Sequence, residues 1–593
     1  MSRRNVSVSP AAGPWRSSGL RRLIRLWRSF PGCAPPGIGV LGVMVRHARA
    51  VCGVALALSL LAAGVARSQD TTSAEAPTVA PFDLVLRGGM LVDGTADATF
   101  PGPIGDVAID AGRIVAIGDL TDRPGVWEID CGGLVVCPGF IDLHNHSDRP
   151  IVAAETRSGV NYLTQGCTTI VTGNCGGGVT EVGEYYDQID RFGAGTNVAH
   201  LIPHGSIRRI AMGGSKDRSP TDEELGRMRS LAAAGMRDGA WGMSTGLIYT
   251  PGSYARTDEL VAVAEIVSGH GGIYASHMRD EGPGLLEAVE ETLRIGREAG
   301  LPVHISHFKA RGQDAWGLVR LAAKLVEQAQ GRGQKVTADQ YPYVASSTSL
   351  DAYVLPPWSR AGGRREMLRR LDDPQDGPKI RDYMRTSLER WRDGATLQIA
   401  TYSPRPDWVG KTLDRIAADE GLDVVDQVMR VVRGGSASVV NFAMSEDDVR
   451  FIMRIPWVAT ASDGRSLLPS ADRPHPRSFG TFTRKLGHYA VRERVVSLAA
   501  AIHSSSGLPA EVLGLTDRGT LRVGQRADVV VFDPQAIIDR ATFEHPHRYS
   551  EGVRHVFVNG TAAVIDGHPT GALAGRALRA ASRETAEVPA AGD

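Results

Sequence analysis

The sequence predicts an α/β protein in which a parallel α/β barrel is inserted into a small β domain made from both ends of the chain. Strand-like and helix-like segments alternate over residues 136–514, which is typical of parallel strands connected by helices. Short strand-like runs with Gly and Asp turns flank this region at 81–135 and 515–575. Neither flank has enough strands to be stable alone, so we expect the two flanks to pair.

The composition indicates an ordinary globular protein. With 593 residues, of which 42% are hydrophobic, the chain can form one large catalytic domain and a smaller one. Lys plus Arg equal Asp plus Glu at 66 each, so no net charge favours nucleic acid or an anionic membrane as a partner. A small-molecule substrate is therefore the expected partner.

The first 80 residues are expected to be an extension, a leader and a linker. Residues 1–43 are rich in Arg and broken by Pro and Gly, without a helical or strand period. Met44 then opens a basic segment followed by an apolar run at 51–65, which is short for a membrane span, and by small residues suited to cleavage. We predict a signal peptide near residues 44–68 and export to the periplasm or medium. An uncleaved anchor is the alternative, and no stable span is expected after cleavage.

The β segments and βα units can be placed in order. Strand-like runs occupy 83–94 and 106–120 near the start and 526–534 and 553–567 near the end, with Asn559-Gly560 as a hairpin turn signal. The clearest βα units pair strands at 271–281 and 301–310 with helices at 284–300 and 315–330, before a third strand at 334–343. Residues 351–400 fit this period poorly and are predicted to be an insertion over the site, and 576–593 a C-terminal tail.

Potential metal ligands follow the predicted strands. His144 and His146 end an apolar run, and residues i and i+2 of a strand face the same side. Further donors follow other strands: Cys175, His277, His307 and Asp463. The carboxyl ends of barrel strands meet at one face, so these six side chains are expected to converge. Imidazole and thiolate together favour zinc over magnesium or calcium.

A zinc site predicts hydrolysis. The ion lowers the pKa of bound water towards about 7 and polarises a carbonyl group. A carboxylate is then needed to take the proton from water and return it to the leaving group. Asp463, in ASDG, is the candidate for this catalytic role, although a turn aspartate before Gly464 would look the same in sequence.

An ordered set of motifs resembles the D-aminoacylase (N-acyl-D-amino-acid deacylase) branch of the amidohydrolase superfamily. The motifs span residues 80–575 and read DLHNHSD, GNCG, TGLIY, ASHMRDE, ISHFK, DQYPYVASST, ASDG, HPRSFGTF and RGTLRVGQRADVVVFD. The resemblance implies a distorted (β/α)8 barrel with a small β-sandwich formed from both chain ends. It also implies a tight zinc site at Cys175, His277 and His307, a weaker second position at His144 and His146, and Asp463 as general acid/base.

The same resemblance implies substrate-binding residues. Lys309, Tyr341, Ser347 and Arg477 match groups around the substrate carboxylate, which two cations would suit chemically. Tyr249 in TGLIY would lie near the developing oxyanion. The GGG after Cys175 departs from the usual pattern, as does Phe308 where a second histidine often stands, so the acyl and side-chain preference stays open.

Four functions can be compared with these residues. The favoured one is a zinc-dependent amidase that removes the acyl group from N-acyl-D-amino acids. A cyclic amidase similar to hydantoinases and dihydroorotases is the alternative, but such enzymes carry a lysine where Cys175 stands. A D-amino-acid-containing dipeptide is another potential substrate. A non-catalytic scaffold would have lost site residues, and all six are present.

Overall fold

The computed structural model describes residues 80–581. The predicted signal peptide and most of the predicted C-terminal tail lie outside these residues. Within the described part of the chain, every helix is too short or too polar to cross a bilayer.

The predicted barrel is confirmed. Its strands are β6 (Phe140–Asp142), β7 (Cys167–Thr172), β8 (Asn197–His200), β9 (Ile202–Pro203), β10 (Gly242–Gly246), β11 (Ile273–His277), β12 (Val303–Ile305), β13 (Val336–Gln340) and β17 (Val458–Thr460). Because only Leu201 separates β8 from β9, these two act as one interrupted strand, so the barrel has eight. Neighbouring strands pair in parallel, and a parallel bridge between Asn145 and Gly464 links the first strand to the last.

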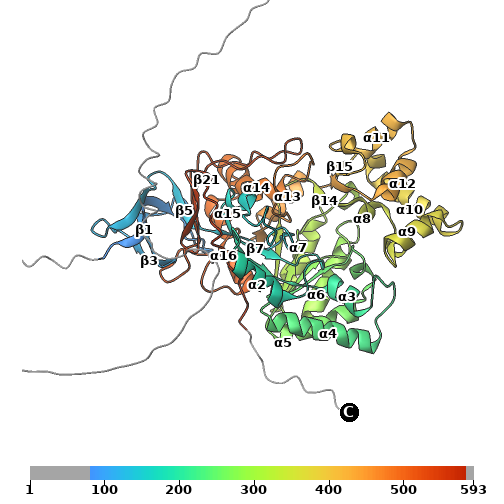
Figure 1. The fold of residues 1–593 in the computed structure, drawn as a ribbon, viewed down its shortest axis with the longest axis horizontal. Coiled ribbons are helices and arrows are strands. Elements are labelled where there is room, and N and C mark those ends of the chain that lie inside the picture. The colour runs from blue at the N-terminus through green and yellow to red at the C-terminus, as the bar shows by residue number, and fades with distance from the viewer. Residues whose placement is uncertain (1–79, 582–593) are drawn as a thin grey trace, which may run out of the picture. The chain divides into compact units, whose positions relative to one another are not determined.

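Helices surround the barrel (Figure 1). They include α2 (Val182–Phe192), α3 (His204–Ala211), α4 (Asp222–Arg237), α5 (Thr257–Gly269), α6 (Leu285–Ala299), α7 (Val319–Gly331), α13 (Glu446–Met453), α14 (Arg477–Thr483), α15 (Leu498–His503) and α16 (Gly507–Leu513). Successive strand residues face opposite sides. Tyr274 therefore packs in the layer between strands and helices, whereas Ile273 and Ala275 fill the barrel interior.

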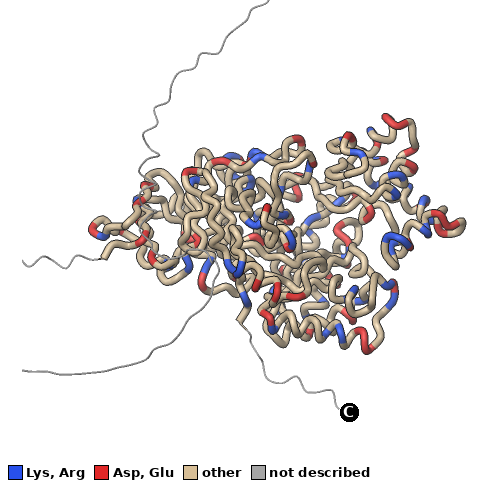
Figure 2. The backbone as a smooth tube through the Cα atoms, in the orientation of Figure 1, with Lys and Arg blue, Asp and Glu red and all other residues tan. Residues whose placement is uncertain are grey.

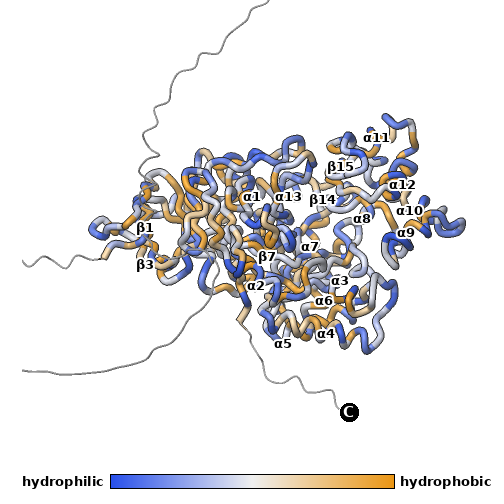
Figure 3. Tube along the Cα trace, viewed as in Figure 1, coloured by the Kyte–Doolittle hydropathy of each residue, from blue (hydrophilic) through white to orange (hydrophobic). Residues whose placement is uncertain are grey.

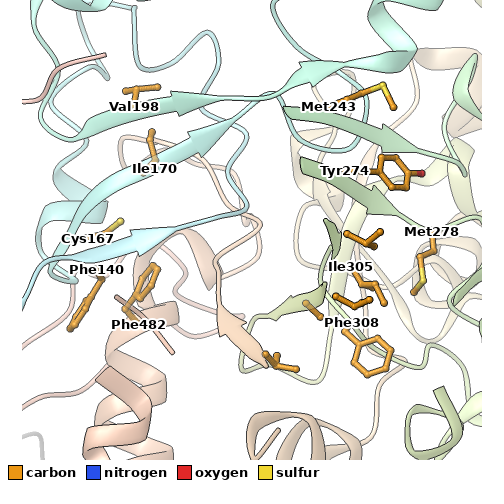
Figure 4. Packing of buried hydrophobic residues seen from close by; sticks show 14 of the residues in the cluster. Phe140, Cys167, Ile170, Val198, Met243, Tyr274, Met278, Ile305, Phe308 and Phe482 are labelled. Carbon is orange, nitrogen blue, oxygen red and sulfur yellow. The ribbon is translucent and has the colours of Figure 1, made fainter. Parts of the chain in front are cut away.

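The strand-helix layer is continuous and apolar. Figure 4 shows Phe140, Cys167, Ile170 and Val198 on three adjacent strands, with Phe482 against Phe140. The two phenyl rings stack with centroids 5.6 Å apart. Figure 3 shows that apolar residues are concentrated in the interior of the fold and polar residues on its outer turns. The barrel strands are thus fixed on both faces, which gives the loops at their ends a rigid base.

The two chain ends join in one nine-stranded sheet. It contains β1 (Phe82–Leu91), β2 (Ile104–Asp110), β3 (Arg113–Gly118), β4 (Gly125–Asp130), β5 (Val135–Pro138), β18 (Val529–Phe532), β19 (Val553–Val558), β20 (Thr561–Ile565) and β21 (His568–Pro569). The antiparallel pairing of β5 with β18 joins the ends, as expected. The hairpin at Asn559-Gly560 is also confirmed, and both residues have positive φ angles of 51° and 81°, as a tight two-residue turn requires.

A separate lobe is inserted between β13 and β17. It contains β14 (Ser346–Ser349), α8 (Leu350–Val354), α9 (Arg364–Asp372), α10 (Asp376–Arg390), β15 (Leu397–Thr401), α11 (Leu413–Glu420), α12 (Val424–Gly434) and β16 (Ser438–Asn441). This inserted lobe has its own three-stranded sheet and apolar core. It extends past the predicted boundary at 400 because β16 pairs with both β14 and β15. Acidic and basic residues intermingle on its surface (Figure 2).

The start of the predicted C-terminal tail pairs with the barrel. The amide of Val198 donates to the Arg576 carbonyl at 2.9 Å, and the Leu578 amide donates to the Val198 carbonyl at 2.8 Å. On this side β10 pairs with β9 and not with β8. The bonds to the tail therefore satisfy backbone groups of β8 that would otherwise lack a partner. The tail therefore completes the barrel wall at the strand interruption.

Lys485 is buried without compensation. It lies in a π-helical segment at Arg484–Arg492, is 3% exposed, and forms no hydrogen bond or ion pair among the described residues. Burial lowers the pKa of its ammonium group from 10.5 to about 7. Since this pKa is higher in the unfolded chain, folding carries a cost that is largest at and below pH 7 and declines as the pH rises to about 10.5.

We therefore expect Lys485→Met to raise the free energy of unfolding by on the order of 3 kcal/mol at pH 7. The gain should shrink steadily between pH 7 and pH 10. Urea unfolding of both proteins at several pH values measures it. Lys324→Met, at an exposed position of α7, is the control and should change the stability by less than about 0.5 kcal/mol. An equal gain at pH 7 and pH 10 would contradict the explanation.

Candidate metal centre

The six predicted donors converge at the carboxyl ends of the barrel strands. The Cys175 Sγ lies 3.3 Å from His144 Nε2, 3.6 Å from His277 Nδ1 and 3.8 Å from His307 Nε2. The Nε2 of His146 lies 3.0 Å from the Asp463 Oδ1. The donors group as three sets whose atoms lie within 4.8 Å of one another: His144, His146 and Cys175; Cys175, His277 and His307; His144, His307 and Asp463.

The turns that present these donors are strained. Cys175, His307 and Asp463 each follow a strand by two or three residues and have positive φ angles of 54°, 37° and 49°. A non-glycine residue rarely adopts this left-handed conformation, which costs on the order of 1 kcal/mol or more. The rigid barrel holds all three side chains inward. The strained residues are therefore the ones that bring the metal donors together.

The donor set fits a zinc ion. In a tetrahedral site with ordinary zinc–sulfur and zinc–nitrogen bonds, sulfur and nitrogen lie about 3.5 Å apart, which matches the distances from Cys175 to His277 and His307. Burial disfavours the Cys175 thiolate, but His144 and His277 together lower the pKa of the thiol well below its usual value. The thiolate is the form that binds metal. The 2.7 Å between His277 Nδ1 and His307 Nε2 is shorter than two ligands of one ion adopt, so these rings would separate slightly on binding.

Two buried carboxylates orient the histidines. Glu281 is 1% exposed, and its Oε1 lies 2.8 Å from His307 Nδ1. Asp339 accepts a hydrogen bond from the His307 amide at 2.7 Å and lies 3.4 Å from His144 Nδ1. Neither residue was identified by the sequence reasoning. Glu281 does lie within ASHMRDE and Asp339 within DQYPY, at or just after a strand end, which is the signal that could have found them.

We expect Glu281→Gln to weaken metal binding by about 10- to 100-fold, because carboxylates behind ligating histidines fix the ring and its tautomer. Competition with a coloured chelator measures the affinity. The matched control is Glu259→Gln, since Glu259 is also a buried glutamate beside a histidine and an arginine, His204 and Arg208, but lies outside the metal centre. Equal metal affinity in wild type and Glu281→Gln would contradict this role.

Asp463 is held as a carboxylate. Its Oδ2 pairs with Arg477 Nη1 at 2.7 Å, while Oδ1 faces His146. Although burial acts in the opposite direction, Arg477 and His144 hold the pKa of Asp463 well below its usual value. An ionised carboxylate beside the metal donors can accept a proton from water.

A cavity of about 540 Å³ opens onto the metal donors. Of the five predicted substrate-binding residues, Tyr249, Ser347 and Arg477 line it together with His146, Cys175 and Asp463. Tyr249 lies with its ring 4.9 Å from the His277 ring and its hydroxyl 3.0 Å from the Thr348 hydroxyl. A larger cavity of about 1170 Å³ lies at the opposite, amino-terminal ends of the strands and contains none of the six predicted donors.

The other two predicted substrate-binding residues lie behind this cavity. Lys309 forms a short ion pair with Glu281 and contacts His307 Nδ1 at 2.8 Å. Tyr341 is 2% exposed, and its hydroxyl has no hydrogen-bond partner among the described residues. Arg477 stacks over the Tyr341 ring at 4.8 Å. The structure thus brings three of the five to the cavity wall and places two beneath it.

Comparison with known proteins agrees with this geometry. Residues 128–564 match the model of the amidohydrolase family. The chain is 39% identical over 521 residues to a D-aminoacylase from Alcaligenes xylosoxydans xylosoxydans, covering 84% of this chain and 98% of the relative. A crystal structure of D-aminoacylase superposes with a TM-score of 0.72 and 35% identity, covering 84% of this chain and all of the other.

A second solved structure extends the comparison. N-acyl-D-glutamate deacylase from Bordetella bronchiseptica, in complex with zinc and a phosphonate inhibitor that mimics the tetrahedral intermediate, superposes with a TM-score of 0.71 and 32% identity, covering 84% of this chain and all of the other. D-hydantoinase, at 16% identity and a TM-score of 0.51, shares the fold. The chain therefore belongs to the amidohydrolase family, in its D-aminoacylase branch.

Proposed function

We propose that this protein is a zinc-dependent hydrolase that cleaves the amide bond of N-acyl-D-amino acids to a carboxylate and a free D-amino acid. The observation that carries the proposal is the convergence of Cys175, four histidines and Asp463 at one centre, with His146, Cys175 and Asp463 on the wall of the adjoining cavity. The family relatives named D-aminoacylase and N-acyl-D-glutamate deacylase support the substrate class. Cys175 in place of a lysine argues against the cyclic amidases.

The residues divide the chemistry between them. Cys175, His277 and His307 would hold the tightly bound zinc, and His144 with His146 would face a weaker second position. Bound zinc would supply activation of water and polarisation of the substrate carbonyl. Asp463 accepts the proton of the attacking water and returns it to the leaving amine, which makes the amine a competent leaving group.

The neighbouring residues position the substrate. The Tyr249 hydroxyl, on the cavity wall, donates a hydrogen bond to the oxyanion that develops on the substrate carbonyl. Ser347 and Arg477, which line the same cavity, bind the α-carboxylate of the amino acid. Lys309 and Tyr341 lie beneath this wall. The cation-π contact of Arg477 with Tyr341 orients the guanidinium plane.

A substrate panel tests the proposal. We expect zinc-loaded protein to release free amine from N-acetyl-D-amino acids and not from their L-enantiomers, hydantoin or dihydroorotate. Amine release is followed with ninhydrin, and each assay is repeated after zinc removal and zinc return. Turnover of the cyclic amides alone would move the function to a cyclic amidase. A zinc-loaded protein that hydrolyses none of these compounds would refute the deacylase.

We also propose that the chain is exported through the predicted signal peptide near residues 44–68. The support is the basic, apolar and small-residue order of that segment. Expression of the full chain in a Gram-negative host followed by fractionation tests it. N-terminal sequencing of the periplasmic protein should begin between residues 67 and 69, and retention of the whole chain in the cytoplasm would contradict export.

A further inference from the structure

A third cavity lies between the barrel and the inserted lobe. Its volume is about 590 Å³. The barrel contributes Leu247 and Ile248 after β10 and Arg311 after β12, and the inserted lobe contributes Tyr353, Arg360 and Trp391. We call this space the lobe cavity. The cavity of about 540 Å³ beside the metal donors, which we call the metal cavity, is lined by other residues. Apolar and aromatic side chains line the lobe cavity together with arginines.

Arg311 is the least compensated of these cations. It is 8% exposed, and its buried Nε has no hydrogen-bond partner among the described residues. The nearest carboxylate oxygen is Glu281 Oε2 at 3.9 Å, which is beyond hydrogen-bonding distance. Its guanidinium lies instead over the rings of Tyr353 and Trp391, at 5.1 and 5.7 Å. A buried guanidinium with unused donors is costly unless a ligand completes them.

Arg360 adds a second available cation from the opposite wall. Among the described residues its side chain donates one hydrogen bond, to the Ile248 carbonyl at 3.3 Å, and its buried Nε lacks a partner there. The other arginines of the lobe cavity are already committed. Arg279 pairs with Glu291 at 2.9 Å, and Arg390 pairs with Asp314 at 3.1 Å.

The acidic groups of the wall leave these two arginines free. Glu291 is bound by Arg279, and Asp280 accepts hydrogen bonds from the amides of Gly282 and Gly284. Glu287, on α6, is exposed to solvent. The lobe cavity therefore offers two guanidinium groups and apolar walls, a combination that suits a short chain ending in a carboxylate.

The lobe cavity adjoins the metal cavity. Ile248 lines the lobe cavity, and its neighbour Tyr249 lines the metal cavity. Likewise, Ala352 lines the lobe cavity and its neighbour Asp351 lines the metal cavity. The Tyr353 hydroxyl lies 2.8 Å from the hydroxyl of Ser346, next to Ser347 in the metal cavity. A substrate bound at the metal centre therefore has the lobe cavity beside its binding site.

We propose that the lobe cavity binds the side-chain carboxylate of an acidic N-acyl-D-amino acid, with Arg311 and Arg360 as the specificity-determining residues. This inference rests on the proposed deacylase function and narrows its substrate class. The apolar walls contact the methylene groups of the side chain, and the two guanidinium groups bind its terminal carboxylate.

Substrate discrimination tests the inference. The assay compares kcat/KM of the zinc-loaded full chain for N-acetyl-D-glutamate with that for N-acetyl-D-leucine. Wild type should favour the glutamate substrate, and Arg311→Gln should lower the glutamate-to-leucine ratio by about 100-fold, as expected when a charged hydrogen bond is lost. Arg360→Gln should lower it by about tenfold. The control Arg279→Gln removes a cation that is already paired and should leave the ratio within about threefold.

Each other outcome counts against the inference. A wild type that prefers the leucine substrate would overturn it, while the deacylase function would stand. If Arg311→Gln lowered both activities equally, the residue would have a structural role only, and the inference would fail.

A binding measurement separates the two proposals. If no N-acyl-D-amino acid is hydrolysed, the proposed function fails, and calorimetry with glutarate on zinc-loaded protein then examines the lobe cavity alone. Glutarate binding that is lost in Arg311→Gln and kept in Arg279→Gln supports an anion site there. Absence of glutarate binding to wild type would refute the site as well.

Discussion

Asp463→Asn is expected to lower amide hydrolysis by about 10³- to 10⁴-fold, which is the upper range for removal of a general acid/base. The amide cannot accept the proton of the attacking water or return one to the leaving amine. The loss should fall on kcat, because Ser347 and Arg477 still bind the substrate carboxylate. Steady-state kinetics with the best substrate of the panel measures it, with the zinc content of each preparation determined in parallel.

The control for this substitution must reproduce the loss of an ion pair. Asp463→Asn leaves Arg477 without its carboxylate partner, which could lower stability rather than chemistry. Asp539 pairs with Arg484 at 3.2 Å in a similarly buried position away from the metal donors, so Asp539→Asn shows the effect of breaking such a pair. We expect Asp539→Asn to keep activity within about threefold. Zinc-loaded Asp463→Asn protein with more than a tenth of wild-type kcat would contradict the assigned role.

Much of the fold follows from local patterns in the sequence. The alternation of strand and helix from residue 271 to 343 predicted β11, α6, β12, α7 and β13, because each element carries its own periodicity. Asn559-Gly560 fixed one hairpin for the same reason. The extent of the inserted lobe was not predictable locally, since its upper boundary depends on β16 pairing with β14, about ninety residues earlier. The C-terminal strand against β8 likewise depends on a partner far away in sequence.

The candidate site was also predictable only in part. Donors at or shortly after a strand end, such as His277 and Cys175, were predictable because strand ends of a parallel barrel share one face. The carboxylates behind them were not, since the pairing of Glu281 with His307 depends on the tilt of two loops. The position of Lys309 shows the same limit. The family resemblance implied that it binds the substrate carboxylate, but Glu281 holds it beneath the cavity wall.

The Arg311 environment also lies beyond sequence reasoning. Tyr353 and Trp391 reach its guanidinium from the inserted lobe, whose placement against the barrel no local pattern encodes. Four arginines line the lobe cavity, yet only their partners decide which are available for a ligand. The chemistry of the metal was therefore predictable from residue types, whereas the selection of substrate depends on contacts between distant segments.

Cys175→Ala is expected to abolish tight zinc binding and reduce hydrolysis to the level of metal-free protein. Its sulfur belongs to two of the three donor sets, and the thiolate supplies the negative charge that balances the ion. The remaining histidines are neutral ligands held at the same strand ends, and we expect their affinity to fall by several orders of magnitude. Elemental analysis after dialysis against a chelator, together with kinetics, measures both effects.

Cys167→Ala is the matched control for this change, because Cys167 lies at the start of β7, the strand that Cys175 follows, and is buried among apolar side chains away from the donors. It should lose about 1 kcal/mol of stability from the small cavity and keep its zinc and activity. Thiol labelling gives a readout independent of turnover. Metal-free wild type should gain one reactive thiol that zinc protects, and Cys175→Ala should lack it. A Cys175→Ala protein that retained one zinc ion per chain through dialysis would show that the histidines and Asp463 suffice to bind zinc. It would contradict the assignment of the Cys175 thiolate as a metal ligand.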